Sequence, residues 1–326
     1  MASILTRGKV EVSLNNSDSK SEADPSPGAR LRGLLSYGAS TQLMGVHDGM
    51  SARIASAEGF AALWASGLCM STALGVRDSD EATWNQLISL VGSMTQATSQ
   101  PILVDGDTGY GNFNTARLFA RAAERVDAAG VCIEDKVFPK MNSFFGNGHQ
   151  LAPVGQFCGK LLACREGVAD ADFVLVARTE TLIAGGPMTE ALDRAAAYAA
   201  AGADAIFIHS RKQDVSEIAE FCRQWGNLRP IIIAPTTYHR TDMTTFRELG
   251  IAGVMWANQS MRAAYTAIRD TCRTVLAQEG VSGIEDQIAP LKEIFSLYEY
   301  EGLEQEEEKY SDWDPPGISE RKAVVW

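Results

Sequence analysis

Short apolar segments recur along the chain, and each of them ends in polar or small residues. Eight can be read, at 42–48 (QLMGVHD), 62–67 (ALWASG), 101–107 (PILVDGD), 130–135 (GVCIED), 173–180 (FVLVARTE), 205–210 (AIFIHS), 230–236 (PIIIAPT) and 253–259 (GVMWANQ). Most are separated by stretches with helical periodicity, such as 114–130 and 188–204, which carry a glycine near the next apolar segment. Apolar segments that alternate with helices are typical of parallel strands buried on both faces.

The number and spacing of these segments predict the fold. Eight β/α units within about 220 residues match the count and length of a (β/α)8 barrel of the TIM type. The alternative is an open, doubly wound sheet, which would carry a GxGxxG fingerprint at its first turn. That fingerprint is absent, and the glycine-rich stretch GDTGYGNFN (106–114) follows the third segment instead. The barrel is therefore favoured, and it places the functional site at the carboxyl ends of the strands.

The length of the chain indicates its domain organisation, and its net charge excludes some classes of binding partner. The chain has 326 residues, of which 45% are hydrophobic, enough for one large barrel domain. We predict a disordered tail at 1–29, a barrel domain at 30–300 and an acidic arm at 301–326. The net charge of −12 argues against nucleic acid and against an anionic membrane surface as partners. An anionic small-molecule substrate would have to be held by a local site.

The spacing of the cysteines and the length of the apolar stretches indicate the cellular compartment of the protein. Six cysteines are spread over more than two hundred residues without a CxxC pair, which favours neither a zinc site nor a disulfide framework. Scattered cysteines fit a reducing compartment, and we expect a cytoplasmic protein. The first 30 residues lack the apolar core of a secretory signal, and no apolar stretch approaches the length of a membrane span.

Four acids follow two neighbouring apolar segments. Asp105 and Asp107 close the third segment, and Glu134 and Asp135 close the fourth. Carboxylates gathered at one barrel mouth repel one another and lose hydration, unless a hard cation such as Mg²⁺ lies among them. The alternative is that each acid caps a helix or pairs with a lysine, as a single aspartate more often does. Four acids at neighbouring strand ends favour the metal site.

Basic groups occupy the ends of the next two segments. Arg178 ends the fifth and His209 the sixth, while Lys136 and Lys140 lie in the stretch EDKVFPKMNSFF that closes the fourth. A guanidinium at a strand end can hold a carboxylate or a phosphoryl group through two hydrogen bonds. The alternatives are that Arg178 pairs with Glu180 or a mouth aspartate, and that His209 is a structural histidine.

The loop after the second segment offers backbone donors. The N–H groups of Ser66, Gly67 and Leu68 can bind an anion as a turn nest does, and Asp78 lies further along the same loop. The alternative is an ordinary connection between a strand and a helix, which the residue pattern fits equally well.

Six stretches of the chain together resemble one family. They are SGLCMSTALGVRDSDEATW (66–84), DGDTGYGNFN (105–114), EDKVFPKMNS (134–143), VARTETLIAG (176–185), GADAIFIHS (202–210) and MWANQSMRA (255–263). From about residue 43 to about 296, the chain resembles the phosphoenolpyruvate mutase branch of the isocitrate lyase superfamily, including its signature of EDK, five residues and NS. The resemblance implies an α/β barrel, a bound Mg²⁺ ion, and the interconversion of phosphoenolpyruvate and phosphonopyruvate in phosphonate biosynthesis.

The same resemblance implies residues for the metal and for the pyruvyl part of the substrate. Asp105 would bind Mg²⁺ directly, and Asp107 and Glu134 would hold the water molecules of the ion. The implied substrate-binding residues are Trp64, Ser66, Gly67 and Leu68. The tryptophan would form a wall, while the serine and the glycine N–H would bind the substrate carboxylate.

The implied catalytic residues are Asp78, Lys140, Asn142, Ser143, Arg178 and His209. Arg178, His209 and Asn142 would grip the phosphoryl group. Lys140 and Ser143 would belong, with Asn142, to a loop that closes over the substrate, and Asp78 would lie near the reacting centre. The chemistry implied is dissociative, so a metaphosphate-like group and an enolate must be held apart from water.

Relatives with other activities differ in the lid. In phosphonopyruvate hydrolases the lid asparagine is replaced, typically by threonine, so Asn142 favours the mutase while hydrolysis stays the alternative. The C–C bond lyases of the superfamily carry a lid cysteine within a KKCGH-like motif, whereas this chain reads KMNSFFGNGH. A barrel retained only for binding would have lost some of these acids or lid groups, and none is missing.

Four departures from the usual mutase pattern concern the edge of the pocket and the fit of the substrate. Alanine replaces glycine at 65, glycine replaces alanine at 106, threonine replaces valine at 179, and Gln-Ser replaces His-Asn at 259–260. A modified phosphonate, such as a carboxylated analogue, is therefore a further alternative substrate. The resemblance also implies homodimers or homotetramers that exchange the last barrel helix, which we expect in the amphipathic stretch 281–302.

Overall fold

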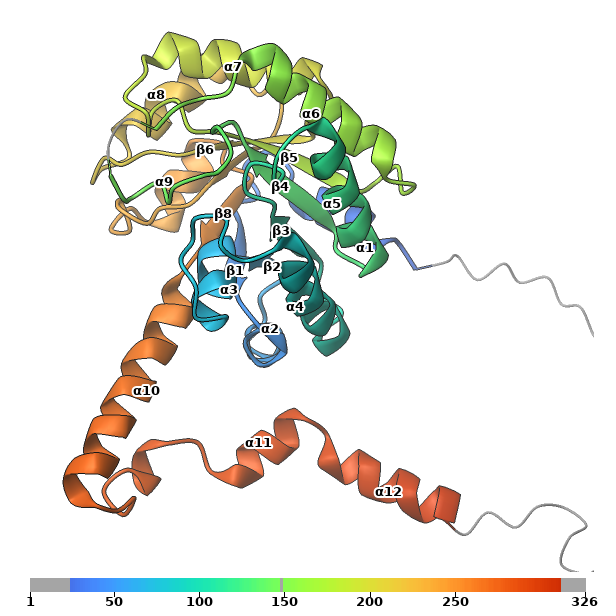
Figure 1. Ribbon diagram of the computed structural model, residues 1–326, viewed down its shortest axis with the longest axis vertical. Coiled ribbons are helices and arrows are strands. Elements are labelled where there is room, and N and C mark those ends of the chain that lie inside the picture. The colour runs from blue at the N-terminus through green and yellow to red at the C-terminus, as the bar shows by residue number, and fades with distance from the viewer. Residues whose placement is uncertain (1–23, 147–148, 312–326) are drawn as a thin grey trace, which may run out of the picture.

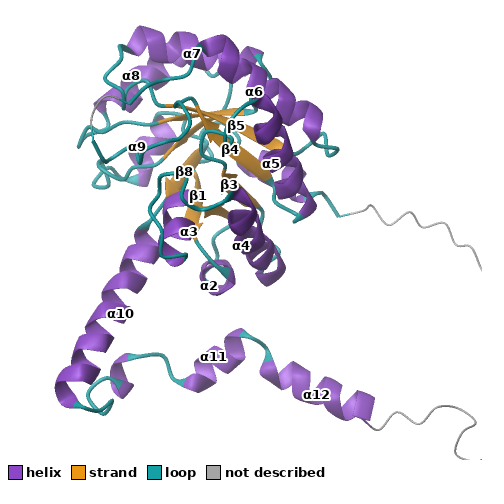
Figure 2. Cartoon of the chain, viewed as in Figure 1, coloured by secondary structure: helices purple, strands orange, loops and turns teal. Residues whose placement is uncertain are grey.

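The computed structural model describes residues 24–146 and 149–311. Its centre is a closed barrel of eight parallel strands that follow one another in sequence order (Figure 1, Figure 2). The strands are β1 Thr41–Val46, β2 Ala62–Ala65, β3 Ile102–Asp105, β4 Gly130–Glu134, β5 Val174–Thr179, β6 Ala205–Ile208, β7 Ile231–Ile233 and β8 Gly253–Trp256. They coincide with the eight apolar segments, and the predicted (β/α)8 barrel is confirmed.

Helices alternate with the strands around the barrel (Figure 2). They are α1 Pro27–Leu34, α2 Gly49–Ala57, α3 Gly67–Ala73, α4 Trp84–Ala97, α5 Phe113–Arg125, α6 Val154–Gly167, α7 Met188–Ala200, α8 Ser216–Trp225, α9 Met243–Glu248, α10 Gln259–Gln278, the 3-10 helix η1 Glu285–Gln287, α11 Leu291–Leu297 and α12 Tyr300–Ser311. Side chains satisfy the free N–H groups where several begin: Asp48 forms a capping box with Ser51 at α2, and Asn112 caps α5. These caps end loops that leave the carboxyl ends of the strands.

Two apolar layers hold the barrel together. An inner cluster fills its interior, and an outer cluster lies between the strands and the helices. Leu31 of the first helix, α1, and Leu35, which follows the helix, add to the inner cluster at the amino-terminal end, where Leu35 lies beside Gly253 at the start of β8. Successive strand residues point to opposite faces, so every second residue of a strand belongs to the interior.

The region after β8 differs from the expectation. The expected amphipathic helix over 281–302 is wrong, because the structure divides this stretch into η1, α11 and the start of α12. Pro290 precedes α11 and cannot continue a helix, since it has no N–H and its ring crowds the preceding turn. The long helix is α10, whose 20 residues include none that is buried, and which projects from the barrel in Figure 1.

The predicted terminal segments are described only in part. Of the expected tail at 1–29, residues 1–23 lie outside the described residues, and the chain enters α1 at Pro27. Of the expected arm at 301–326, the part up to Ser311 belongs to α12, and 312–326 lie outside the described residues. Within 24–146 and 149–311, no helix combines the length and the apolar character needed to cross a bilayer.

Candidate active site

The alternation of strand residues directs four polar side chains into the mouth of the barrel. The inner apolar cluster includes one layer from strands β3 to β6, namely Leu103, Cys132, Val176 and Phe207. The residues two positions further along, which face the same way, are Asp105, Glu134, Arg178 and His209. All four line one pocket at the carboxyl ends of the strands, so the structure brings together the residues that the sequence placed at strand ends.

Three acids meet on one side of this mouth. The side chains of Asp105, Asp107 and Glu134 are all buried. The Gly67 N–H donates to Asp105 Oδ2 (3.1 Å) and the Asp107 N–H to Asp105 Oδ1 (3.3 Å), which fixes the Asp105 carboxylate. A Cβ at Gly67 would lie 3.0 Å from an oxygen of each aspartate, so a residue without a side chain lets the two carboxylates come together here.

The acids offer oxygen ligands in a buried place where their charges are only partly offset. Burial raises the pKa of Asp105 and raises that of Asp107 well above its ordinary value, because their charged forms lose hydration. Lysines offset part of the charge: Lys140 Nζ lies 2.6 Å from Asp107 Oδ1, and Lys136 Nζ lies 3.1 Å from Glu134 Oε1. Among the described residues, no three acid, histidine or cysteine side chains have the arrangement of a formed metal centre. The carboxylate oxygens are nonetheless the ligand type that Mg²⁺ prefers.

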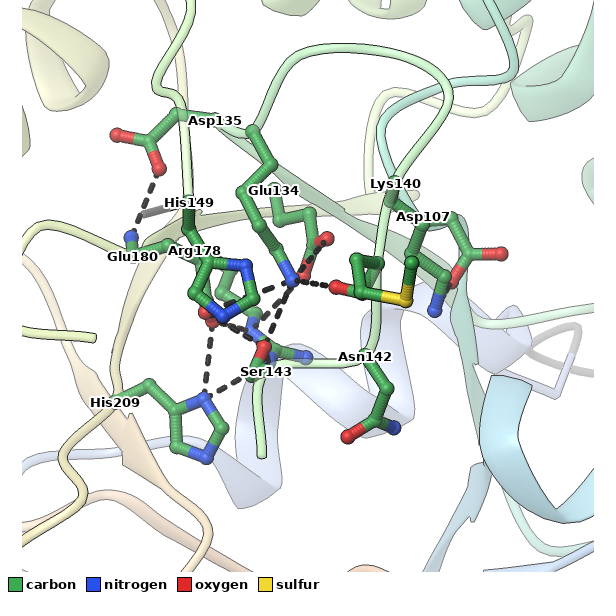
Figure 3. Close-up of polar contacts among 12 residues, drawn as sticks. Asp107, Glu134, Asp135, Lys140, Asn142, Ser143, His149, Arg178, Glu180 and His209 are labelled. Carbon is green, nitrogen blue, oxygen red and sulfur yellow. Dashed lines mark hydrogen bonds and ion pairs between the residues drawn. The ribbon is translucent and has the colours of Figure 1, made fainter. Parts of the chain in front are cut away.

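Glu180 holds the two basic groups of the site from behind (Figure 3). Its Oε1 pairs with Arg178 Nε and lies 3.0 Å from His209 Nδ1, which is also 2.8 Å from Arg178 Nη2. This nitrogen donates to Glu180 in one tautomer and accepts from Arg178 in the other. Burial and the charge of Arg178 lower the pKa of His209, so its ring is neutral near pH 7. The sequence left open whether Arg178 binds substrate or pairs with Glu180. In the structure Arg178 lines the pocket and also pairs with Glu180.

The lid, defined as residues 137–146, is closed over the mouth. Lys140 Nζ lies 2.6 Å from Asp78 Oδ1, and Asn142 Nδ2 donates to Asp78 Oδ2 (2.6 Å). Asn142 Oδ1 accepts the Phe144 N–H (2.9 Å), which fixes the orientation of the amide. Burial opposes the charge of Lys140, but Asp107 and Asp78 outweigh it and hold its pKa well above the usual range. The lid therefore brings a permanent positive charge to the acids.

Ser143 docks the lid onto the barrel (Figure 3). Its hydroxyl donates to Glu180 Oε2 (2.7 Å) and accepts from Lys136 Nζ (2.8 Å) and Arg178 Nη2 (2.9 Å). Lys136 Nζ also donates to the Met141 carbonyl oxygen (2.8 Å). The EDK and NS parts of the signature therefore touch one another directly in the folded chain.

The expected pyruvyl side is built from the end of β2. Trp64, Ser66 and Leu68 line the pocket. The Ser66 hydroxyl accepts the Cys69 N–H (3.4 Å) and so caps α3. The Gly67 N–H donates to Asp105, so its expected contact with a substrate carboxylate stays a prediction.

Several contacts were invisible in the sequence. Asp80 accepts the Lys140 N–H (2.5 Å) across 60 residues, and the Phe144 ring lies edge-on to His209 with 5.2 Å between the ring centres. Asn258 lines the pocket from the loop after β8. The sequence offered only one indication for Asp80, its position two residues after Asp78 in a loop. This position does not reveal which backbone N–H group Asp80 binds.

Residues 31–276 match the family described as phosphoenolpyruvate phosphomutase. Over 287 residues the chain is 66% identical to the phosphoenolpyruvate phosphomutase of Streptomyces hygroscopicus, spanning 88% of this chain and 92% of that protein. A solved phosphoenolpyruvate phosphomutase from Streptomyces platensis subsp. rosaceus is 38% identical with a TM-score of 0.85, over 87% of this chain and 99% of that one. A phosphonopyruvate hydrolase solved with oxalate and Mg²⁺ is 30% identical with a TM-score of 0.83, over 88% of this chain and 100% of that one.

Proposed function

The chain belongs to the phosphoenolpyruvate phosphomutase family, and we propose that the site at its barrel mouth interconverts phosphoenolpyruvate and 3-phosphonopyruvate. The phosphoryl group moves within one substrate: the P–O bond to the enol oxygen breaks, and a C–P bond forms to the carbon that was the methylene. No atom is gained or lost. The chain is thus an isomerase that makes the C–P bond of phosphonates.

The observation that carries this proposal is the meeting of three donors around one buried pocket. Arg178, His209 and the lid residue Asn142 all line it. A phosphoryl group in transit resembles metaphosphate, which needs donors that hold it without attacking it. An amide can donate to such a group, yet it does not readily act as a base toward water. Asn142 therefore supports transfer within the substrate over hydrolysis.

We propose that Asp105, Asp107 and Glu134 hold Mg²⁺. When bound, the ion supplies positive charge for an enolate, in addition to that of Lys140 and Arg178. The chain's own part is to orient the ligands: the Gly67 N–H fixes Asp105, and Lys140 lies against Asp107.

The remaining residues of the site position the substrate or keep water out. Trp64, Ser66 and Leu68 would hold the pyruvyl part of the substrate, so that it can turn and present either oxygen or carbon to the phosphorus. Asp78 holds Lys140 and Asn142 at the lid, which keeps water away from the phosphoryl group.

An enzyme-coupled assay tests the activity and separates it from hydrolysis. The purified protein receives phosphonopyruvate and Mg²⁺ with lactate dehydrogenase and NADH, with or without pyruvate kinase and ADP. Phosphoenolpyruvate consumes NADH only when pyruvate kinase and ADP are present, whereas pyruvate from hydrolysis consumes it in both cases. We expect dependence on pyruvate kinase. Equal rates in both mixtures would replace the mutase with the hydrolase.

We propose self-association and a cytoplasmic location as further properties. The exposed apolar residues of α10, Tyr265, Ile268 and Leu276, support a contact between copies of this chain, giving a dimer or tetramer by helix exchange. The six cysteines are all free, as in a reducing compartment. Light scattering at micromolar concentration should give a multiple of 35.2 kDa, and a mass of one chain would contradict the exchange.

A further inference from the structure

Arg211 reaches the lid from the loop after β6. Its Nε donates to the Ser143 carbonyl oxygen (2.7 Å), and its Nη2 donates to the same oxygen and to the Gly146 carbonyl oxygen (3.2 Å). Nη2 also lies 2.8 Å from His149 Nε2. A guanidinium can only donate, so this Nε2 accepts the hydrogen bond. One side chain therefore contacts the lid at two points, Ser143 and Gly146, and also contacts His149 beyond it.

Among the residues that the structure describes, the charge of Arg211 has no carboxylate partner. Arg178 pairs with Glu180 and Arg194 with Glu190, but within 24–146 and 149–311 no acid forms an ion pair with Arg211. Hydrogen bonds from a charged donor are stronger than those between neutral groups. Because the two acceptors within the lid, at Ser143 and Gly146, are backbone carbonyls, Arg211 holds the path of the lid backbone.

Ser143 is thus held both through its side-chain hydroxyl and through its backbone carbonyl oxygen. Lys136, Glu180 and Arg178 bind its hydroxyl, and Arg211 binds its carbonyl oxygen. The contacts of the hydroxyl lie within the site. The contact with Arg211 ties the lid backbone at Ser143 to the loop after β6, as Asp80 ties the lid backbone at Lys140 to the loop between α3 and α4.

We propose that Arg211 is a positioning residue that clamps the lid shut and so decides whether the phosphoryl group moves to the enolate or to water. The proposal rests on the proposed mutase function. Arg211 lies outside the set of residues lining the pocket, so it acts through Ser143 and the lid backbone. A looser lid would admit water, and a mutase would then release phosphate and pyruvate in part of its turnovers.

Two measurements on Arg211→Met test the clamp. Limited trypsin digestion with mass spectrometry follows cleavage after Lys140, whose side chain is buried while the lid is closed. Phosphorus NMR of turnover follows the share of product released as phosphate. Losing bonds from a charged donor should favour the open lid by about tenfold, so we expect both quantities to rise on that order, with a higher KM.

Two further variants serve as controls. Lys212→Met removes the same charge from the next residue, which is exposed and, among the described residues, forms its one ion pair with Glu217 (3.5 Å), so it should match the wild type. Arg211→Lys keeps the charge but cannot span three acceptors, so it should lie between the wild type and Arg211→Met.

The outcomes separate this proposal from the proposed function. Faster cleavage after Lys140 together with more phosphate supports the clamp. Cleavage equal to the wild type overturns it, and so does faster cleavage with an unchanged share of phosphate. A wild type that makes no phosphoenolpyruvate would defeat the mutase function instead, while the digestion would still report on the clamp. If Arg211→Met does not fold, Arg211→Lys must show the same changes to a smaller degree, and an unchanged Arg211→Lys contradicts the proposal.

Discussion

The two halves of the barrel mouth differ in charge. Strands β3 to β6 and the lid bring Asp105, Glu134, Lys140, Arg178 and His209 to the pocket. Strands β7 and β8 and the loops after them bring Ala234, Thr236, Met255, Ala257 and Asn258, none of which is charged. Both halves are built by the same alternation of inward residues, so the difference lies in side-chain chemistry and not in backbone geometry.

This difference suits a reaction that separates charge in a dry site. The charged half can hold a phosphoryl group and stabilise an enolate, because opposite charges attract strongly where water is absent. The uncharged half offers few groups that could hold a water molecule near the phosphorus. A barrel mouth that was charged all round would hold substrates equally well but would also stay hydrated.

Removal of an acid from the charged half should have the largest effect. Asp105→Ala is expected to lower kcat by about a thousandfold or more, because the proposed metal would lose a ligand and the enolate its positive charge. Turnover should also stop in excess chelator. Glu166→Gln, at an exposed acid on α6, is the matched control and should leave the rate unchanged. Full activity in chelator would contradict the metal site.

Truncation of the lid amide should cost less. Asn142→Ala is expected to lower kcat by about a hundredfold, the scale for one donor to transition-state charge. Steady-state kinetics with phosphonopyruvate measures the change, and Asn85→Ala, at an exposed position of α4, controls for loss of an amide elsewhere. A normal rate in the variant would mean that Asn142 serves only to hold Asp78.

A hydroxyl on the uncharged half should have a smaller effect on rate. Ala234→Ser places a polar group against the pocket on the loop after β7. We expect at most about a tenfold loss of kcat, the scale of one ordinary hydrogen bond, with a measurable share of phosphate among the products. Ala234→Cys, similar in size and less polar, should release less phosphate. A loss of kcat as large as that of Asn142→Ala would contradict the proposed difference between the two halves of the barrel mouth.

Asp135 belongs to the charged half by sequence but faces away from the pocket, against Tyr198 and Arg194. Burial raises its pKa from 3.8 to about 6, so the folded protein binds this proton more tightly than the unfolded chain. Its contribution to the free energy of unfolding is therefore full below about pH 4 and is lost as the pH rises through about 6.

Asp135→Asn should remove that contribution, so the difference in unfolding free energy between variant and wild type should change by about 2 kcal/mol between pH 4 and pH 6, most of the roughly 3 kcal/mol that a shift of two pKa units represents. Urea unfolding at several pH values measures it. A difference that does not vary with pH would show that Asp135 titrates normally.

The barrel was predictable because its signal is periodic and local. Eight apolar segments and their polar ends are read directly from the sequence, and alternation within each strand then directs Asp105, Glu134, Arg178 and His209 inward. The last helix was misjudged because the amphipathic spacing over 281–302 outweighed the presence of Pro290.

The network around the lid could be predicted only in part. The resemblance named Lys140, Asn142 and Ser143, but their partners depend on contacts between distant loops, such as Lys140 with Asp80 and Ser143 with Arg211. Such contacts to backbone atoms leave no pattern in the sequence, because any residue at the receiving position has the same N–H or carbonyl group.

Phosphorus NMR of phosphonopyruvate turnover in ¹⁸O-labelled water tests the central claim most directly. Transfer within a closed, dry site predicts a growing phosphoenolpyruvate signal, little free phosphate, and no ¹⁸O in the phosphoryl group. Stoichiometric phosphate that carries one ¹⁸O, with no phosphoenolpyruvate, would contradict it, because water and not the enolate would then have taken the phosphoryl group.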